Sequence, residues 1–434
     1  MPLHQRVVIT GMGLISPLGL TLDSFWKSLS EGKSGVSACA HEDGLPIPYA
    51  AFASEFDGEI SGFGEIDPQL KKTIRKGLKL MSREIQMCVA ATQRALLDAD
   101  IAPGQLAPER VGTSIGSDYI LTTSDELLDA VKACCDENGA FDFGVWGDRG
   151  LAKMNPLWQL KYLPNMPSSH VAICNDFRGV CNSVTLREAS IGASIGEAVQ
   201  IIASGKTDVM VVGATGSRLH PVKMIHALQT EQVARKTVAP EEICRPFDRN
   251  RCGMVLGEGA GTLVLESEEH ALGRGARIYA EIPCGTYVIH FGRDRVPHRR
   301  AALKHAMTEL FYRTGTTAGQ IGHVNAHGLS TETSDKAEAR AIHEMFEGRH
   351  VPVTAAKSYF GNLGAGSGAV ELIAGVLALQ HQQLFPILNN MTGDPDCPMT
   401  PVREFGAPAG DSFVKLAVSP QAQATAILVR KYCP

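Results

Sequence analysis

Four polar side chains could form a chemical site in this chain: Glu188, His327, Lys357 and Asn362. Glu188 precedes the small-residue segment 190–198, which has helical character, so its carboxylate would lie at the positive end of a helix. There it could act as a general base or pair with His327 or Lys357. The helix and nearby cations would lower its pKa, whereas burial would raise it. Asn362 can donate a hydrogen bond but cannot carry a charge or a proton.

Alternating strand and helix signals predict the elements that position these residues. A buried strand is expected at 6–11, and an amphipathic helix at 80–99. Two consecutive halves of this kind, 1–267 and 268–434, predict a layered α/β fold. A less regular stretch at 118–164 is expected to form an insertion over the core. Further strands are expected at 110–117, 208–213, 261–266, 277–282, 323–326, 352–356, 413–418 and 424–430, and further helices at 22–30, 301–314 and 368–379.

The composition is that of an ordinary globular protein, with 434 residues, 44% of them hydrophobic, and a net charge of -5. That charge gives no overall basic surface for nucleic acid, and no apolar run is long enough for a membrane span. The amino terminus lacks the apolar core of a signal peptide, so a cytoplasmic location is expected. The 11 cysteines show no Cys-x-x-Cys spacing, which predicts reduced thiols and no metal site. No dinucleotide fingerprint, P-loop or G-x-S-x-G elbow is present, so no cofactor is expected.

Five ordered segments carry a longer pattern. They are RVVITGMGLISPLG at 6–19, a strand–elbow–helix sequence at 179–198, RPFDRNRCGMVLGEGAG at 245–261, VNAHGLST at 324–331 and AKSYFGN at 356–362. Together they resemble the beta-ketoacyl-acyl-carrier-protein synthases, the ketosynthase family, over nearly the whole chain. The resemblance implies the thiolase-like fold, in which two similar halves stack as five αβαβα layers. It also implies a dimer and an acyl carrier protein as partner.

The same resemblance implies a site of one Cys, two His and one Lys. In that family the Cys accepts an acyl group from a thioester, and the histidines stabilise the enolate formed when a malonyl group loses carbon dioxide. His327 and Lys357 match the first histidine and the lysine, and Glu371 matches the carboxylate that orients the lysine. Glu188 stands at the cysteine position and Asn362 at the second histidine position.

The carboxy-terminal gating segment also departs from the family pattern. A phenylalanine–glycine run of the type GFGGTN is replaced here by VSPQAQA at 418–424, in which Pro420 and Gln421 are expected to contact substrate. Pro420 and the missing glycines disfavour the tight gating turn. A carboxylate at position 188 is a poor nucleophile toward a thioester and would yield a high-energy mixed anhydride. Condensation of the usual kind is therefore expected to be lost.

Other nucleophiles lie near the elbow. Cys174 and Cys181 fall in strand-like, apolar surroundings, which favours buried structural thiols over a displaced nucleophile. Ser190 could face the pocket as a supporting residue. We favour the interpretation that Ser190 is a small residue that permits close helix packing, because no base is evidently paired with its hydroxyl.

Three interpretations of Glu188 remain open. In the first, its carboxylate fills the pocket of a non-condensing subunit that resembles the chain-length factor of type II polyketide synthases and pairs with a Cys-bearing ketosynthase. In the second, Glu188 and His327 perform general-base or acyl-transfer chemistry on an acyl thioester of fatty-acid or polyketide biosynthesis. The third is decarboxylation of a malonyl thioester, which the negative charge of Glu188 disfavours. Homodimer and heterodimer are both compatible with the sequence.

Two basic clusters could meet an acidic carrier protein. The first lies on an expected loop and contains Arg293, Arg295, His298, Arg299 and Arg300. The second follows one side of an expected helix and contains Lys71, Lys72, Arg75, Lys76 and Lys79. For such a helical row, a solvated face is the usual explanation.

Overall fold

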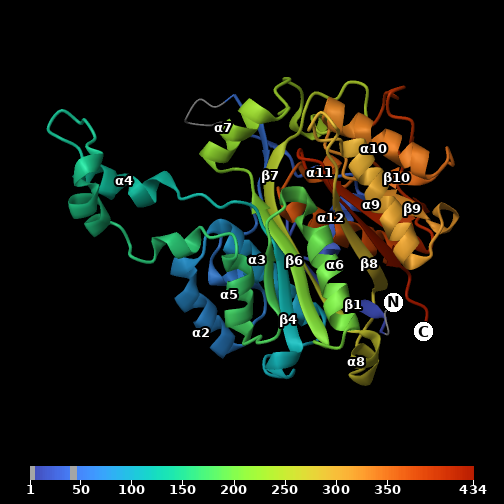
Figure 1. Cartoon of the computed structure of the whole chain (residues 1–434), viewed down its shortest axis with the longest axis horizontal. Coiled ribbons are helices and arrows are strands. Elements are labelled where there is room, and N and C mark those ends of the chain that lie inside the picture. The colour runs from blue at the N-terminus through green and yellow to red at the C-terminus, as the bar shows by residue number, and fades with distance from the viewer. Residues whose placement is uncertain (1–4, 40–45) are drawn as a thin grey trace.

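One long twisted sheet runs through the computed structural model, which describes residues 5–39 and 46–434 (Figure 1). Its strand order is β12-β10-β9-β14-β15-β8-β1-β7-β6-β4-β5, so each half of the chain supplies one side. The two sides join where β1 pairs antiparallel with β8, at Val8 with Glu281 and Ile9 with Ala280. The principal strands are β1 Val7–Ile15, β4 Val111–Gly116, β5 Cys181–Val184, β6 Val209–Ser217, β7 Leu256–Ser267, β8 Ala280–Ile289, β9 His323–Asn325, β10 Pro352–Thr354, β14 Ser412–Val418 and β15 Gln423–Arg430. Short strands are β2 Ser37–Ala38, β3 Tyr49–Ala51, β11 Gln383–Leu384, β12 Thr400–Pro401 and β13 Ala407–Pro408.

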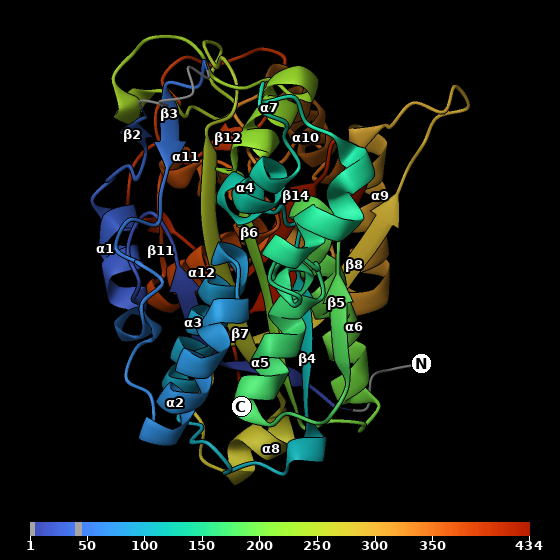
Figure 2. The same cartoon turned by 90° about the vertical axis from the view of Figure 1, so that its left-hand side faces the viewer.

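Helices cover both outer faces of the folded sheet and fill the space between its two sides (Figures 1 and 2). On one outer face α3 packs against β1, β6 and β7, and on the other α9 packs against β8 and β15. Between the two sides, α6 contacts β6 and β8, and α12 contacts β7 and β14. The expected αβαβα order is therefore present. The helices are α1 Leu22–Ser30, α2 Pro68–Gly77, α3 Arg83–Asp98, α4 Ser124–Ala133, α5 Met166–Asn175, α6 Ser190–Ala203, α7 Pro221–Thr230, α8 Glu268–Gly273, α9 Arg299–Thr314, α10 Glu332–Met345, α11 Lys357–Phe360 and α12 Gly366–His381.

The small residues of α6 explain how this helix lies so close to the second half of the sheet. A Cβ atom at Gly192 would stand 2.3 Å from Cβ of Thr425 on β15, and one at Gly196 would stand 2.6 Å from the carbonyl oxygen of Gly285 on β8. Any larger side chain at these two positions would force the helix away from the strands. The glycines thus fix the position of α6, and with it the turn that precedes the helix.

The stretch 118–164 forms an arm that extends away from the body of the molecule (Figure 1). The expected placement of this insertion over the core is wrong. The arm contains α4 and several short helical turns, and its apolar side chains are unusually exposed, with Phe143 at 74%. Aromatic rings pack on one another inside the arm, Phe143 stacking on Trp146 with ring centroids 6.3 Å apart. These local contacts shape the arm but leave much of its apolar surface uncovered.

Two expectations about cysteines are corrected by the structure. Cys174 lies on α5 rather than on a strand, and Cys181 is exposed on β5, the edge strand of the sheet. Neither is a fully buried thiol. The boundary between 267 and 268 stays a prediction; α8 begins at Glu268. Within the residues that the structure describes, no helix is both long and apolar enough to span a bilayer.

Candidate functional site

The turn between β5 and α6 points Glu188 into the interior of the molecule. Arg187 has φ +53°, in the left-handed region, where a residue with a side chain costs roughly 1–2 kcal/mol. The chain then passes through a short 3-10 turn, Arg187–Ala189, into α6. The backbone N–H of Leu186 donates to Ser190 Oγ at 3.0 Å, which ties the two sides of the turn together. Glu188 is thereby held at the amino end of α6 with 2% of its surface exposed.

The hydroxyl of Ser190 forms hydrogen bonds that stabilise the elbow. Besides accepting from Leu186, its hydroxyl lies 3.4 Å from the carbonyl oxygen of Ser117, to which it donates. A Cβ atom at Gly116 on β4 would stand 2.6 Å from Cβ of Ser190. The start of α6 therefore packs directly against β4, where only a glycine fits opposite Ser190. Both hydrogen bonds involve backbone groups, and they connect the elbow to the end of β4.

Glu188 is one of four charged side chains that form a closed ring. Its Oε1 accepts from Arg218 Nη1 at 3.0 Å and from Arg187 Nη2 at 3.3 Å, and also from the amide of Asn362 at 3.0 Å. Glu231 accepts from Arg187 Nη2 at 2.9 Å and from Arg218 Nη2. We call Glu188, Arg218, Glu231 and Arg187 the charge ring. Its two carboxylates and two guanidinium groups balance, which is what allows charges to be buried at this depth.

The charge ring determines the ionisation of Glu188. Burial alone raises the pKa of this carboxyl group, but the positive charges of Arg187 and Arg218 and the hydrogen bond from Asn362 outweigh burial. The resulting pKa lies well below its usual value. Glu188 is therefore an anion throughout the physiological pH range. A carboxylate stabilised to this degree is a weak base and a weak nucleophile.

His327 belongs to a second buried group, centred on Lys357. Lys357 Nζ donates to His327 Nδ1 at 3.1 Å, to the carbonyl oxygen of His327 at 3.1 Å, and to Glu371 Oε1. Lys415 Nζ lies 2.6 Å from the other oxygen of Glu371. Among the described residues Glu188 accepts no hydrogen bond from His327 or Lys357, contrary to the pairing expected. The carboxylate uses arginines instead, while Lys357 contacts Glu371.

The contacts of Lys357 define the protonation of His327. An ammonium group has three protons, and the three contacts of Lys357 use them all, so Nδ1 of His327 accepts. The imidazole then carries its proton on Nε2. Burial and the adjacent charge of Lys357 lower the pKa of His327 well below its usual value, so the ring is neutral at physiological pH. His327 can donate a hydrogen bond from Nε2, but the neutral ring holds no second proton that it could release as an acid.

Asn362 is oriented as a donor toward the carboxylate. Its Oδ1 accepts from the backbone N–H of Gly364 at 3.0 Å and from Ser367 Oγ at 3.1 Å. With the oxygen fixed on that side, Nδ2 points at Glu188. The amide of Asn362 therefore helps to hold the negative charge of Glu188 in place.

Pro420 and Gln421 lie at the tip of a hairpin whose two strands contact the elbow at Arg187–Ala189. They occupy the turn between β14 and β15, in which the N–H of Ala422 donates to the carbonyl oxygen of Ser419 at 3.0 Å. Gln421 is exposed, and the carbonyl oxygen of Pro420 accepts from Arg299 at 3.4 Å. Neither residue has a hydrogen bond to Glu188, His327 or Asn362 within the described part of the chain. A substrate-contacting role for this turn stays a prediction.

The residues that complete the site were missed in the sequence for an identifiable reason. Arg218 directly follows β6 and Glu231 directly follows α7, and neither lies in a segment that carries the ketosynthase pattern. Arg187 was the available signal, because a cation next to Glu188 in sequence is an obvious partner. No group of three or more His, Cys, Asp or Glu side chains suited to a metal ion occurs in the described residues.

Comparison with known proteins agrees with this fold. Residues 4–271 match the family description "Beta-ketoacyl synthase, N-terminal domain", and residues 285–391 match "Beta-ketoacyl synthase, C-terminal domain". The chain therefore belongs to the beta-ketoacyl synthase family, and the thiolase-like fold class expected from the sequence is confirmed.

Curated relatives in this family share about a third of their residues with the chain. It is 30% identical over 401 residues to "3-oxoacyl-[acyl-carrier-protein] synthase 2" of Synechocystis sp., covering 91% of this chain and 90% of that protein. It is 32% identical over 410 residues to "Actinorhodin polyketide putative beta-ketoacyl synthase 1" of Streptomyces coelicolor, covering 91% and 82%.

Solved structures show the same fold over almost the full chain. A beta-ketoacyl synthase from Burkholderia phymatum superposes with a TM-score of 0.85 at 27% identity, covering 99% of this chain and 100% of that one. "The ishigamide ketosynthase/chain length factor" superposes with a TM-score of 0.82 at 24% identity, with the same coverage. At that identity the second likeness concerns the fold alone.

Proposed function

We propose that this chain is a non-condensing subunit, similar to a chain-length factor, that pairs with a Cys-bearing ketosynthase in fatty-acid or polyketide synthesis. In this role it handles acyl thioesters of an acyl carrier protein without forming an acyl-enzyme itself. The cytoplasmic location expected from the sequence is part of the proposal. The observation that carries the proposal is the buried carboxylate of Glu188, whose Oε1 accepts from Arg187, Arg218 and Asn362, at the position that the resemblance assigns to the family's nucleophilic cysteine.

The chemistry of the charge ring supports loss of condensation. Attack by Glu188 on a thioester would give a mixed anhydride and would also break the ion pairs that hold the carboxylate. General-base catalysis is favoured when the pKa of the base lies near the working pH, and the pKa of Glu188 is shifted far from it. A malonyl carboxylate would additionally meet the negative charge of Glu188.

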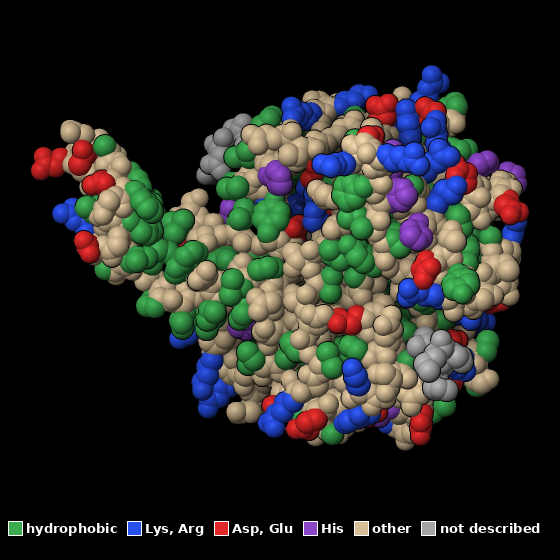
Figure 3. All heavy atoms as spheres, in the orientation of Figure 1, with side chains coloured by type: hydrophobic (Ala, Val, Ile, Leu, Met, Phe, Trp, Pro, Cys, Tyr) green, Lys and Arg blue, Asp and Glu red, His purple; other side chains and the backbone are tan. Residues whose placement is uncertain are grey.

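The exposed surface supports a partner of the same fold. Apolar side chains crowd the arm, as the green side chains at the left of Figure 3 show, and they include Phe141, Phe143, Leu151 and Leu157. Apolar patches of this kind on a water-facing segment are typical of interfaces. At the base of the arm, β5 pairs with no described strand other than β4, and so leaves one edge free for another strand. A second chain of the same fold would bring its own free strand edge, with which this edge could pair.

Co-expression with a Cys-bearing ketosynthase tests this proposal. We expect the two chains to co-purify as a heterodimer, with thioester turnover only in the pair, because this chain lacks a competent nucleophile. Intact-mass spectrometry after incubation with acyl and malonyl thioesters should show no adduct on this chain. A stable homodimer that turns over thioesters by itself would refute the non-condensing role.

A second candidate is an unconventional enzyme that uses Glu188 with His327 for general-base, acyl-transfer or decarboxylation chemistry. It is favoured by one observation, the neutral imidazole of His327 with its Nε2 proton directed by Lys357. Such a donor could stabilise an oxyanion. Under this candidate, Glu188→Gln should abolish turnover by the chain alone and His327→Ala should weaken it.

The carrier protein is proposed to dock on the hairpin between β8 and α9. Arg293 and Arg295 are exposed there, whereas Arg299 turns inward toward Pro420 and Arg300 pairs with Glu344. Reversing the charge in an Arg293→Glu, Arg295→Glu variant should weaken carrier binding about fivefold to tenfold, with reduced salt dependence. Biolayer interferometry at two ionic strengths measures this effect.

The second basic cluster provides the matched comparison. Lys72 and Lys76 on α2 carry the same charge and are exposed on another face of the molecule. A Lys72→Glu, Lys76→Glu variant should bind the carrier as the parent does. If this variant loses binding and the hairpin variant retains it, the docking surface is α2 and the proposal for the hairpin is wrong.

A further inference from the structure

The carboxylate of Glu371 is held between two buried lysines. Its Oε1 accepts from Lys357 Nζ, and Lys415 Nζ lies 2.6 Å from its Oε2. The three side chains are at most 1% exposed. Lys415 lies in none of the segments that carry the ketosynthase pattern. An ammonium group is costly to remove from water, so its position beside Glu371 points to a role for Lys415 in the site.

The sheet fixes Lys415 next to Glu371. Strand β14 pairs in parallel with β9, which places Lys415 opposite Asn325. The amide of Asn325 donates to the carbonyl oxygen of Glu371 at 2.7 Å, and Lys415 Nζ also donates to the carbonyl oxygen of Leu416. Burial lowers the pKa of Lys415, and the adjacent carboxylate of Glu371 opposes that change. The carboxylate therefore favours the ammonium form of Lys415.

The contact with Lys415 limits what Glu371 can do to Lys357. A carboxylate with both oxygens free can turn them onto one cation. Here Lys415 engages Oε2, so only Oε1 is left for Lys357. The ammonium group of Lys357 keeps its other two protons for the carbonyl oxygen and Nδ1 of His327, each at 3.1 Å. Lys415 thus acts on the imidazole through Glu371 and Lys357.

We propose that Lys415 is a positioning residue, which engages one oxygen of Glu371 so that Lys357 stays on Nδ1 of His327 and the imidazole presents its proton on Nε2. That nitrogen is buried and has no hydrogen-bond partner among the described residues. The carbonyl oxygen of an acyl thioester is an acceptor that suits it. This ligand rests on the proposed function, whereas the state of the imidazole does not.

The protonation of His327 depends on charged groups from several elements. They are Lys357 on α11, Glu371 on α12, Lys415 on β14, Arg299 on α9, Glu188 before α6 and Glu338 on α10. The positive charges of Lys357, Lys415 and Arg299 lower the pKa of His327, and the charge of Glu188 raises it. Removing the charge of Lys415 should therefore raise that pKa.

Nuclear magnetic resonance of the full chain with ¹⁵N-labelled histidine tests the role of Lys415, and the signals absent from a His327→Gln variant identify those of His327. In the parent, His327 should be neutral and protonated on Nε2 down to about pH 5. A ring protonated on Nδ1, or one that titrates near the usual pKa of about 6.5, would overturn the proposal. This measurement needs no variant, and it involves neither substrate nor partner. Its failure is therefore distinct from failure of the co-purification test.

Lys415→Met removes the charge and the donor but keeps an unbranched side chain. In this variant His327 should show both neutral tautomers, and its pKa should rise by about one pH unit. Unchanged tautomer and pKa would show that Lys415 does not position the imidazole.

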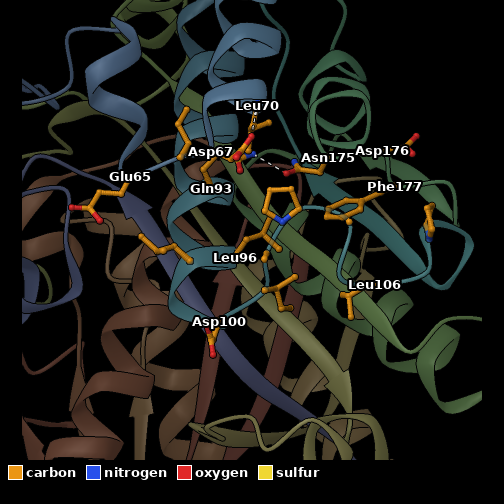
Figure 4. Close-up of a pocket in the computed structure, with 17 residues that line it drawn as sticks. Glu65, Asp67, Leu70, Gln93, Leu96, Asp100, Leu106, Asn175, Asp176 and Phe177 are labelled. Atoms are coloured by element: carbon orange, nitrogen blue, oxygen red, sulfur yellow. Dashed lines mark hydrogen bonds between the residues drawn. The ribbon is translucent and has the colours of Figure 1, made fainter.

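A buried amide elsewhere provides the control for a general loss of stability. Gln93 is 4% exposed and donates to Asn175 Oδ1 at 3.1 Å (dashed in Figure 4). It lines a cavity of about 260 Å³, to which His327, Lys357, Glu371 and Lys415 contribute no side chain. Gln93→Met should lower stability and leave His327 as in the parent. If Gln93→Met alters His327 as Lys415→Met does, the role of Lys415 is only structural and the proposal is wrong.

Discussion

Replacing Arg218 with methionine should lower the free energy of unfolding by about 3–5 kcal/mol, the range typical when one partner of a buried ion pair is removed. Arg218 is 6% exposed, and its guanidinium group contacts both carboxylates of the charge ring. Without it, Glu188 and Glu231 must share Arg187 alone, and a net negative charge remains buried. Urea denaturation followed by tryptophan fluorescence measures the change.

Two further variants show whether the loss has this electrostatic cause. Arg178→Met removes an exposed arginine that pairs with Asp176 at the surface, and it should leave stability nearly unchanged. Combining Arg218→Met with Glu231→Gln should restore part of the lost stability, because charge balance returns. If Arg218→Met is as stable as Arg178→Met, the charge ring does not stabilise the fold.

The second large effect is on the pH dependence of stability. In the folded state the pKa of Glu188 is depressed below that in the unfolded chain, so its ionisation stabilises the fold at all pH values above the unfolded pKa of about 4.3. As pH falls below that value, the carboxylate of Glu188 binds a proton in the unfolded chain but not in the folded chain. Stability should then fall by about 1.4 kcal/mol for each pH unit from this group alone, and continue to fall through the acidic range.

Glu188→Gln removes this contribution and therefore tests it. The variant should be less stable than the parent at neutral pH, because two guanidinium groups face one carboxylate. Its unfolding free energy should decline less steeply than that of the parent between about pH 4 and pH 3. Glu404→Gln should keep the slope of the parent. Equal slopes in the parent and in Glu188→Gln would show that the carboxylate is not held as an anion.

The layered fold was predictable because its elements leave strong local patterns. A buried strand was expected at 6–11, and it continues as β1 to Ile15 with every residue of Val7–Ile15 buried. The small residues of α6 indicated a helix packed closely on its neighbours. Glu188 was placed at the helix start on the same basis. The direction of the arm was not predictable, because a segment rich in glycine and aromatic residues can pack inward or outward, and its own sequence does not decide which.

The partners of Glu188 illustrate a different limit. Arg218 is brought to the site by the end of β6, and the pairing register of a sheet is a property of the whole fold. His327 and Lys357 looked equally suited to a carboxylate, but Lys357 has its three protons committed to His327 and Glu371. Which cation pairs with which anion depends on geometry that spacing along the chain does not contain.

The left-handed backbone at Arg187 has a consequence for how such proteins diversify. The turn aims residue 188 into the interior through the main chain alone, with φ set at the preceding position and the helix anchored by glycines. The direction of residue 188 consequently does not depend on which side chain stands there. In a chain of this fold, residue 188 can therefore differ while the architecture stays the same, provided that neighbouring elements neutralise any charge it carries, as Arg187 and Arg218 do here.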